Sequence, residues 1–202
     1  MRWLAAIALA LAAPVAADPT ATDPAAPAST APPPTLVHAE LDPLPFATIG
    51  YGGQVGVRPA GWGGVRVAVA SFSLHVPGPL AELGGNDGFA LQVRPSVAAY
   101  ALWYARRPGR DGLAVGASVR YLRLRYTRAD APNLDATTAE LSPEAIVGYQ
   151  WHPWHNGFYL QPWFALGVTI YRSGTARIAG HAYQALPVSP FLTVNVGWEQ
   201  PL

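Results

Sequence analysis

Histidine and serine are the first candidates for catalysis or metal binding in this chain, which has no cysteine. His152 and His155 bracket a tryptophan-rich turn, and Ser173 and His181 follow further along the chain. A zinc site needs three or four ligands at defined spacing, and no such set occurs, so neither a metal nor another cofactor is predicted. A Ser–His pair could carry acyl transfer, but no motif joins these four residues. We therefore expect no enzymatic activity.

Charged residues are the second candidates for chemistry, and they are scarce. They make up 12% of the chain, against about 25% in an average soluble protein. Six of them share the polar faces of alternating segments: Arg66, Arg94, Arg120, Glu140, Glu144 and Glu199. They could line a binding or conduction site, or they could pair with one another and fill an interior. Buried charges must be paired, and the two signs fall on consecutive segments, which favours the paired network.

Strands must position these residues, because hydrophobicity alternates with a period of two. Residues 139–152 and 157–172 alternate without interruption, whereas strands in soluble proteins usually have about 5–6 residues. The same alternation occurs in residues 47–57, 62–75, 89–105, 112–127 and 188–199. Two of these segments change phase, after Ala70 and after Tyr121. A β-bulge, or departure of the strand from an apolar layer, would explain either change.

The composition of the two strand faces indicates the surrounding solvent. One face is continuously apolar, and the other carries glycine, alanine, serine, glutamine and tyrosine, which suit the crowded inside of a narrow barrel. Six aromatic residues crowd one turn, as in the interfacial girdle of a membrane barrel: Tyr149, Trp151, Trp154, Phe158, Tyr159 and Trp163. The pattern predicts an all-β fold, a transmembrane antiparallel up-and-down β-barrel, because a closed barrel satisfies every backbone group in lipid.

The N-terminus predicts export from the cytoplasm. Residues 1–17 contain one arginine, a short apolar stretch and small residues before Asp18, which is the pattern of a signal peptide. A membrane anchor is the alternative. Residues 18–45 are rich in proline and alanine and predict a disordered leader, so the barrel is expected to span residues 46–202. Without the signal, 12 arginines balance 12 acidic residues, which argues against binding to nucleic acid.

These features together resemble the small bacterial outer-membrane β-barrel proteins. The resemblance rests on the signal, the leader, the alternating strands, the hairpin "GYQWHPWHNGFYLQPW" and the closing "PFLTVNVGWE". It implies a monomer in the bacterial outer membrane that contacts membrane lipids and is inserted by the outer-membrane assembly machinery. Such chains usually end in an aromatic residue. This one ends "WEQPL", so Trp198 would serve instead.

Such barrels normally have an even number of strands, so residues 175–185 complete a predicted set of eight. This assignment places the long connections 76–88 and 128–138 in the periplasm, although long loops usually face outward. If residues 172–187 form a loop instead, a strand is missing near the start.

The function predicted is a structural, adhesive or narrow-pore role. The alternatives are a lipid-modifying enzyme that uses His152, His155, Ser173 or His181, and a channel for a small hydrophobic solute.

Overall fold

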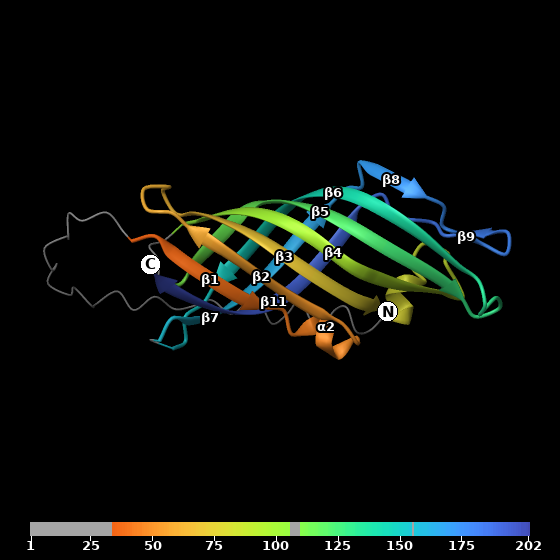
Figure 1. The fold of residues 1–202 in the computed structure, drawn as a ribbon, viewed down its shortest axis with the longest axis horizontal. Helices are drawn as coiled ribbons and strands as arrows, with labels where there is room; N and C mark the ends of the chain where they lie inside the picture. The colour runs from red at the N-terminus through yellow and green to blue at the C-terminus, as the bar shows by residue number, and fades with distance from the viewer. Residues whose placement is uncertain (1–33, 106–109, 155) are drawn as a thin grey trace, which may run out of the picture. The chain divides into compact units, whose positions relative to one another are not determined.

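The computed structural model describes residues 34–105, 110–154 and 156–202 (Figure 1). The described residues all belong to one compact unit, Pro32–Leu202. The predicted signal peptide and residues 18–33 of the predicted leader lie outside the described part of the chain. No helix among the described residues has the length and apolar character needed to cross a bilayer.

Within the described residues, eight antiparallel strands close into a ring. In chain order they are β1 (Leu36–Leu41), β2 (Tyr51–Arg58), β3 (Val65–Val76), β4 (Phe89–Tyr104), β5 (Gly112–Arg128), β6 (Asp135–Gln150), β7 (Phe158–Gly167) and β11 (Ser189–Pro201). Each pairs with the next, and β1 pairs with β11 to close the ring. Closure leaves no free sheet edge around the ring. The predicted eight-stranded up-and-down β-barrel is confirmed.

The eighth strand, however, is not the one predicted. Residues 175–185 form a loop with a two-residue hairpin, β9 (Arg177–Ile178) and β10 (His181–Ala182). The missing strand is β1, which lies inside the stretch predicted to be a disordered leader. The barrel therefore begins at Leu36 rather than at residue 46. The prolines before and after "LVHAEL" obscured a short strand that alternates as regularly as the others.

With β1 in place, the two ends of the barrel differ. The terminal end holds Leu36, Pro201, the connection 59–64 and, after β4 and β6, the described residues 105, 110–111, 151–154 and 156–157. The distal end holds the connections 42–50, 77–88, 129–134 and 168–188, which include α2 (Leu44–Ala47), α3 (Gly78–Ala81) and the hairpin. The predicted strand count put 76–88 and 128–138 at the end where the barrel begins. They lie at the opposite end, because one more strand at the start moves every later connection across the barrel.

The outward face near the terminal end is an apolar belt. Its members alternate with buried residues along every strand of the ring. They include Leu41, Val55, Val69, Val97, Trp103, Leu113, Val115, Val119, Tyr121, Val147, Tyr149, Phe158, Phe164, Leu166, Val194, Val196 and Trp198. From Leu113 to Tyr121 the belt extends about 27 Å along β5 at about 3.4 Å per residue. A strand tilt of about 40° reduces this to about 20 Å, close to the apolar band of membrane barrels.

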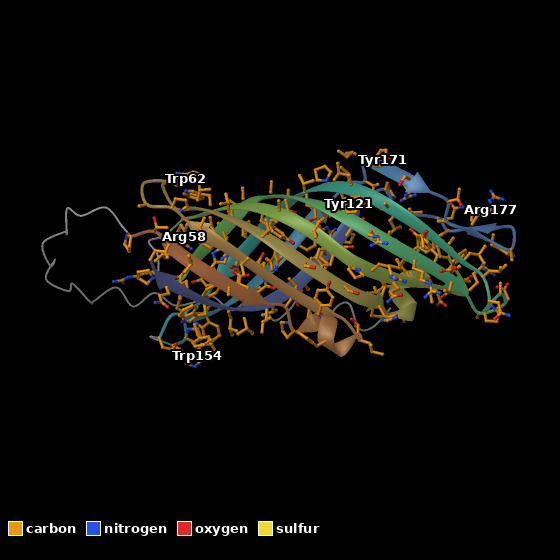
Figure 2. The ribbon with its side chains drawn as sticks, in the orientation of Figure 1. Arg58, Trp62, Tyr121, Trp154, Tyr171 and Arg177 are labelled. Atoms are coloured by element: carbon orange, nitrogen blue, oxygen red, sulfur yellow. The ribbon has the colours of Figure 1, made fainter. Side chains whose placement is uncertain are left out.

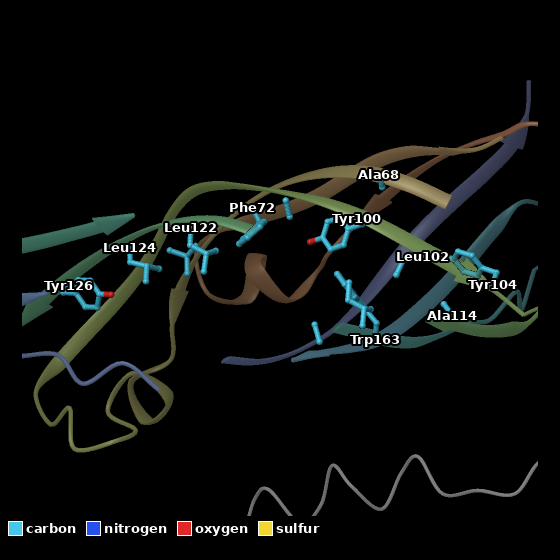
Figure 3. Packing of buried hydrophobic residues seen from close by; sticks show 14 of the residues in the cluster. Ala68, Phe72, Tyr100, Leu102, Tyr104, Ala114, Leu122, Leu124, Tyr126 and Trp163 are labelled. Carbon is cyan, nitrogen blue, oxygen red and sulfur yellow. The ribbon is translucent and has the colours of Figure 1, made fainter. Parts of the chain in front are cut away.

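Beyond the belt, β3 to β6 continue and the polarity of their faces is exchanged. We call residues 71–96, 122–141 and 171–188 the distal extension. Along β5, Leu122, Leu124 and Tyr126 point inward and are buried, while Arg123 is exposed and Arg125 is partly exposed. Figure 3 shows the three buried side chains in a row on the inner side of the strand. The phase change after Tyr121 is therefore not a bulge: β5 keeps its alternation and leaves the apolar layer.

Strand β4 does contain a bulge, at the level where the belt ends. Arg94 pairs with Arg123 and Val97 pairs with Tyr121, so two residues of β4 lie opposite one of β5. Ser96 holds the bulge: its Oγ donates to the Arg94 carbonyl oxygen (2.7 Å) and accepts from the Arg123 backbone N–H (3.0 Å). The extra residue moves Arg94 from the inner face to the outer face.

Candidate functional site

The barrel interior contains a charged network centred on Glu40 of β1 and Arg66 of β3, both fully buried. Arg66 Nη1 lies 2.5 Å from Glu40 Oε1. The carboxylate also accepts from the Tyr159 hydroxyl (2.6 Å), the Asn195 side-chain amide (2.6 Å) and the Gln54 side-chain amide. Five strands thus meet at one carboxylate, so the network crosses the lumen and fills its middle.

Arg66 extends this network to the opposite wall. Its Nη2 donates to Gln161 Oε1 on β7 (3.0 Å), and the Tyr104 hydroxyl donates to the same oxygen (3.2 Å). The guanidinium carbon lies 4.9 Å from the centre of the Tyr104 ring. The buried cation is therefore held by a carboxylate, an amide and an aromatic face together, which is the condition for a charge to remain in a low-dielectric interior.

A second network lies toward the terminal end. Arg58 Nη2 is 3.7 Å from Glu199 Oε2 and donates to Gln150 Oε1 at 3.2 Å. His152 Nε2 lies 3.2 Å from Glu199 Oε1, and the His152 backbone N–H donates to Asp111 Oδ1 at 2.7 Å. The side chains of Arg58 and Glu199 are both nearly buried. This network crosses the lumen near the mouth at which β1 begins and β11 ends.

Two further carboxylates of β6 are paired toward the distal end. Glu144 contacts Arg120 and accepts from the Ser118 hydroxyl at 2.6 Å. Glu140 Oε1 lies 2.8 Å from Arg172 Nε. Each pair joins neighbouring segments of the sheet. Arg120 and Glu144 both belong to the predicted lumen set, whereas Arg172 does not.

Close packing completes the interior. A Cβ at Gly197 would overlap the ring of Tyr159, so glycine is required where this ring crosses the lumen. A void of about 30 Å³ remains beside Glu40, Gln54, Tyr100 and Arg120. At about 10–15 Å³ per water molecule, this volume has room for two or three waters. Among the described residues, the middle of the lumen is therefore filled with side chains.

The structure separates the predicted lumen residues into two groups. Arg66, Arg120, Glu140, Glu144 and Glu199 are buried in the interior. Arg94 is exposed on the outer wall, because the bulge at Ser96 reverses the faces of β4. The sequence analysis missed this bulge since Leu91, Val93 and Val97 form an apparently continuous apolar face.

The predicted aromatic girdle also divides. Tyr149, Trp151, Trp154 and Phe158 are exposed near the terminal end, whereas Tyr159 and Trp163 are buried inside the barrel. The assignment of those two to the girdle is wrong because strand alternation places them opposite Phe158. Three tyrosines mark the other edge of the belt: Tyr51, Tyr121 and Tyr171. Figure 2 shows Trp62 and Trp154 near one end and Tyr121 and Tyr171 near the middle of the barrel.

Several residues of the interior network were not predicted. They are His38, Glu40, Gln54, Arg58, Tyr159, Gln161 and Asn195. Arg172, the exposed partner of Glu140, was not predicted either. The segment "LVHAEL" carried the signal for the first two: His38 and Glu40 alternate with Val37, Ala39 and Leu41. Alternation over only six residues therefore predicts β1, and with it the carboxylate at the centre of the lumen.

The residues considered for catalysis are dispersed. His152 lies inside the lumen at the terminal end, whereas Ser173 and His181 are exposed in the distal extension. His155 lies outside the described residues. The part of the chain that the structure describes contains no group of three or more histidine, aspartate and glutamate residues placed to bind a metal.

The loop 175–188 covers the inner face of the distal extension. Ile178 is buried, and the Tyr183 ring packs on Phe89 (centroids 5.5 Å apart) and Tyr126 (4.8 Å). The Asn86 side chain donates to the Gln184 carbonyl oxygen and accepts from its backbone N–H. Burial raises the pKa of the Tyr183 hydroxyl. The distal mouth of the barrel is therefore capped by a packed loop.

Comparisons with known proteins give similar folds at low similarity. The crystal structure of Neisserial surface protein A superposes with a TM-score of 0.47 and 11% identity, covering 83% of this chain and 94% of that one. A major outer membrane protein from Thermus thermophilus gives 0.46 and 13%, covering 83% and 98%. No protein-family model and no curated protein matches the chain.

The arrangement of the faces decides the fold type independently of these likenesses. A closed ring with a polar, paired interior and an apolar outer belt satisfies all backbone groups and presents hydrocarbon-compatible side chains to lipid. The chain has the fold of a bacterial outer-membrane β-barrel. In this outer-membrane barrel, the interior networks and the capped distal extension are the two places that combine polar side chains with a defined geometry.

Proposed function

We propose that the protein is a non-conducting outer-membrane barrel whose role is structural or adhesive. The barrel would anchor the distal extension and present it at the cell surface. The observation that carries this proposal is the Glu40 network, which crosses the lumen at mid-height and joins five strands through one carboxylate. A barrel interior occupied by paired charges and aromatic rings favours an anchor over the narrow-pore role.

The proposal includes a sidedness. The start of β1, the C-terminal end of β11, the connection 59–64 and the ends of β4 and β6 share one end, whereas the longer connections 77–88 and 168–188 lie at the other. Outer-membrane barrels have short periplasmic turns and longer extracellular loops. We therefore assign the terminal end to the periplasm and the distal extension to the outside. Contact with outer-membrane lipids, insertion by the assembly machinery, a monomeric state and the absence of enzymatic activity belong to the same proposal.

The distal extension supports a surface role because it is built as a folded object rather than as loose loops. Its strands bury Phe89, Leu124 and Tyr126 inward and expose polar residues outward, and the loop 175–188 closes it. A surface with fixed strands can present side chains at defined positions to a partner.

Single-channel recording in a planar bilayer tests the proposal. The refolded chain should show no stable openings, while heat-modifiable gel mobility confirms that the barrel is folded. A variant with Glu40→Ala and Arg66→Ala should show openings, because the two side chains at the centre of the mid-lumen network are shortened. A control variant with Arg125→Ala and Asp135→Ala removes an exposed pair of the distal extension and should remain silent. Stable openings of the unmodified protein would overturn the non-conducting role.

A further inference from the structure

Two arginines on the outer wall lie side by side without an acidic partner. Arg94 of β4 and Arg123 of β5 are directly opposite in the antiparallel register, and both are exposed. Among the described residues, neither guanidinium makes a hydrogen bond or an ion pair. Like charges that face each other across two strands destabilise the sheet. An anion from outside the chain would relieve this repulsion.

The neighbouring arginines of β5, by contrast, have acidic partners within the chain. Arg125, two residues further along β5, lies 2.6 Å from Asp135, and Arg128 lies 2.8 Å from Asp130. Regular alternation of β4 would place Arg94 on the inner face. The bulge held by Ser96 turns it outward, beside Arg123. The β-bulge thus places two arginines without acidic partners next to each other.

The height of the pair on the barrel indicates the kind of anion. The row below it, at the edge of the belt, consists of Val97, Tyr121, Leu141 and Tyr171, joined strand to strand by register. The arginines are two residues above Tyr121 along β5, about 7 Å at about 3.4 Å per residue. Apolar and aromatic side chains suited to acyl chains therefore lie directly beneath two guanidinium groups, at the level where lipid head groups begin.

We propose that Arg94 and Arg123 bind the phosphate of a lipid head group in the outer leaflet. Guanidinium groups form paired hydrogen bonds with phosphate oxygens, and two adjacent groups match one dianionic phosphate. The acyl chains of the same lipid would lie along Val97, Val119 and Tyr121, which are exposed on the same wall. This site goes beyond the proposed anchoring role and does not depend on whether the lumen conducts.

Native mass spectrometry of the full chain in neutral detergent tests the site, with diphosphoryl lipid A as the probe. A variant with Arg94→Gln and Arg123→Gln should bind it about 30-fold more weakly, since each basic residue near a membrane surface contributes about 1 kcal/mol and 1.4 kcal/mol corresponds to tenfold. The matched control, Arg110→Gln with Arg177→Gln, removes the same charge from exposed positions away from this wall and should bind normally. Fully dephosphorylated lipid A should bind as weakly to the unmodified protein as the diphosphoryl form binds to the variant.

Two further measurements distinguish a lipid phosphate from a free anion. Arg123→Glu gives Arg94 a partner within the chain and should also abolish the preference for the phosphorylated lipid. Inorganic phosphate, titrated alone, should neither bind nor displace the lipid at millimolar concentration. Equal lipid binding by the double variant, an equal loss in the control, or displacement by inorganic phosphate would each overturn the proposal. The last of these would assign the pair to a free anion.

Discussion

The belt region and the distal extension use the same strands but opposite faces. In the belt, β5 exposes Val115 and Val119 and buries Ser118 and Arg120; above Tyr121 it exposes Arg123 and buries Leu122 and Leu124. The direction in which side chains point does not change along the strand. What changes is the solvent outside, from hydrocarbon to water. Because the outer wall of the extension faces water, its outward side chains are polar. The apolar side chains of the same strands therefore pack inward and form a core, where the belt region has paired polar groups.

This difference shows where the stability of each region is concentrated. The belt region has a polar interior, so its strength lies in paired buried charges, whose partners are costly to remove. The distal extension resembles a sheet of a water-soluble protein whose apolar face is covered by a loop. Its stability therefore comes from the burial of Phe89, Leu124 and Tyr126, while its ion pairs are exposed. Parallel substitutions in the two regions should therefore have different effects.

The largest difference is expected for removal of a carboxylate. Glu40→Gln leaves the Arg66 charge buried without its anion and should lower the free energy of unfolding by about 3–5 kcal/mol. Asp135→Asn removes the partner of Arg125, whose pair is 40% and 45% exposed, and should cost about 0–1 kcal/mol. Urea titration of both variants in lipid vesicles, followed by tryptophan fluorescence, provides the comparison. Equal costs would mean that the lumen charges are hydrated rather than buried.

A smaller difference is expected for addition of a charge to the outer wall. Ala117 of β5 lies midway along the belt, between Leu113 and Tyr121. Ala117→Arg should cost about 2–4 kcal/mol, as arginine does at the mid-plane of a bilayer. Thr137→Arg places the same side chain on the exposed outer wall of the extension and should change stability by less than about 0.5 kcal/mol. If Thr137→Arg proved as costly as Ala117→Arg, the belt would have to extend above Tyr121.

Much of the fold followed from alternation alone, and the errors have identifiable physical causes. The strands that became β2 to β7 and β11 were predicted because a long period-two segment places all its apolar side chains on one face only when it is extended. Strand β1 was missed because proline near a short segment reduces its strand signal. Arg94 was misplaced because a bulge flanked by valine on both sides leaves no trace in hydrophobicity. The bulge becomes visible only through the register with β5.

The sequence predicted that opposite charges would pair inside the barrel, but it did not identify most of the residues that do so. Opposite charges on consecutive strands indicated pairing, and Arg120–Glu144 lies where that argument places it. The Glu40–Arg66 pair joins β1 to β3 across β2, and its further partners come from the opposite wall. Contacts across a lumen depend on barrel closure and on the height of each residue, which a single sequence does not specify.

The smallest expected effect concerns Ser96, at the boundary between the two regions. Ser96→Ala removes the hydroxyl that accepts from the Arg123 backbone N–H and donates to the Arg94 carbonyl oxygen. The loss of one bond that satisfies a buried group should cost about 1–2 kcal/mol. Hydrogen exchange should locate the effect, with faster exchange at the Arg123 amide and unchanged protection at Val119 in the belt. Ser118→Ala, which removes a hydrogen bond to Glu144 inside the belt region, is the matched control and should leave the Arg123 amide protected. If the Arg123 amide exchanged at the same rate in Ser96→Ala, strand pairing rather than Ser96 would hold the bulge, and Arg94 would keep its outward position without it.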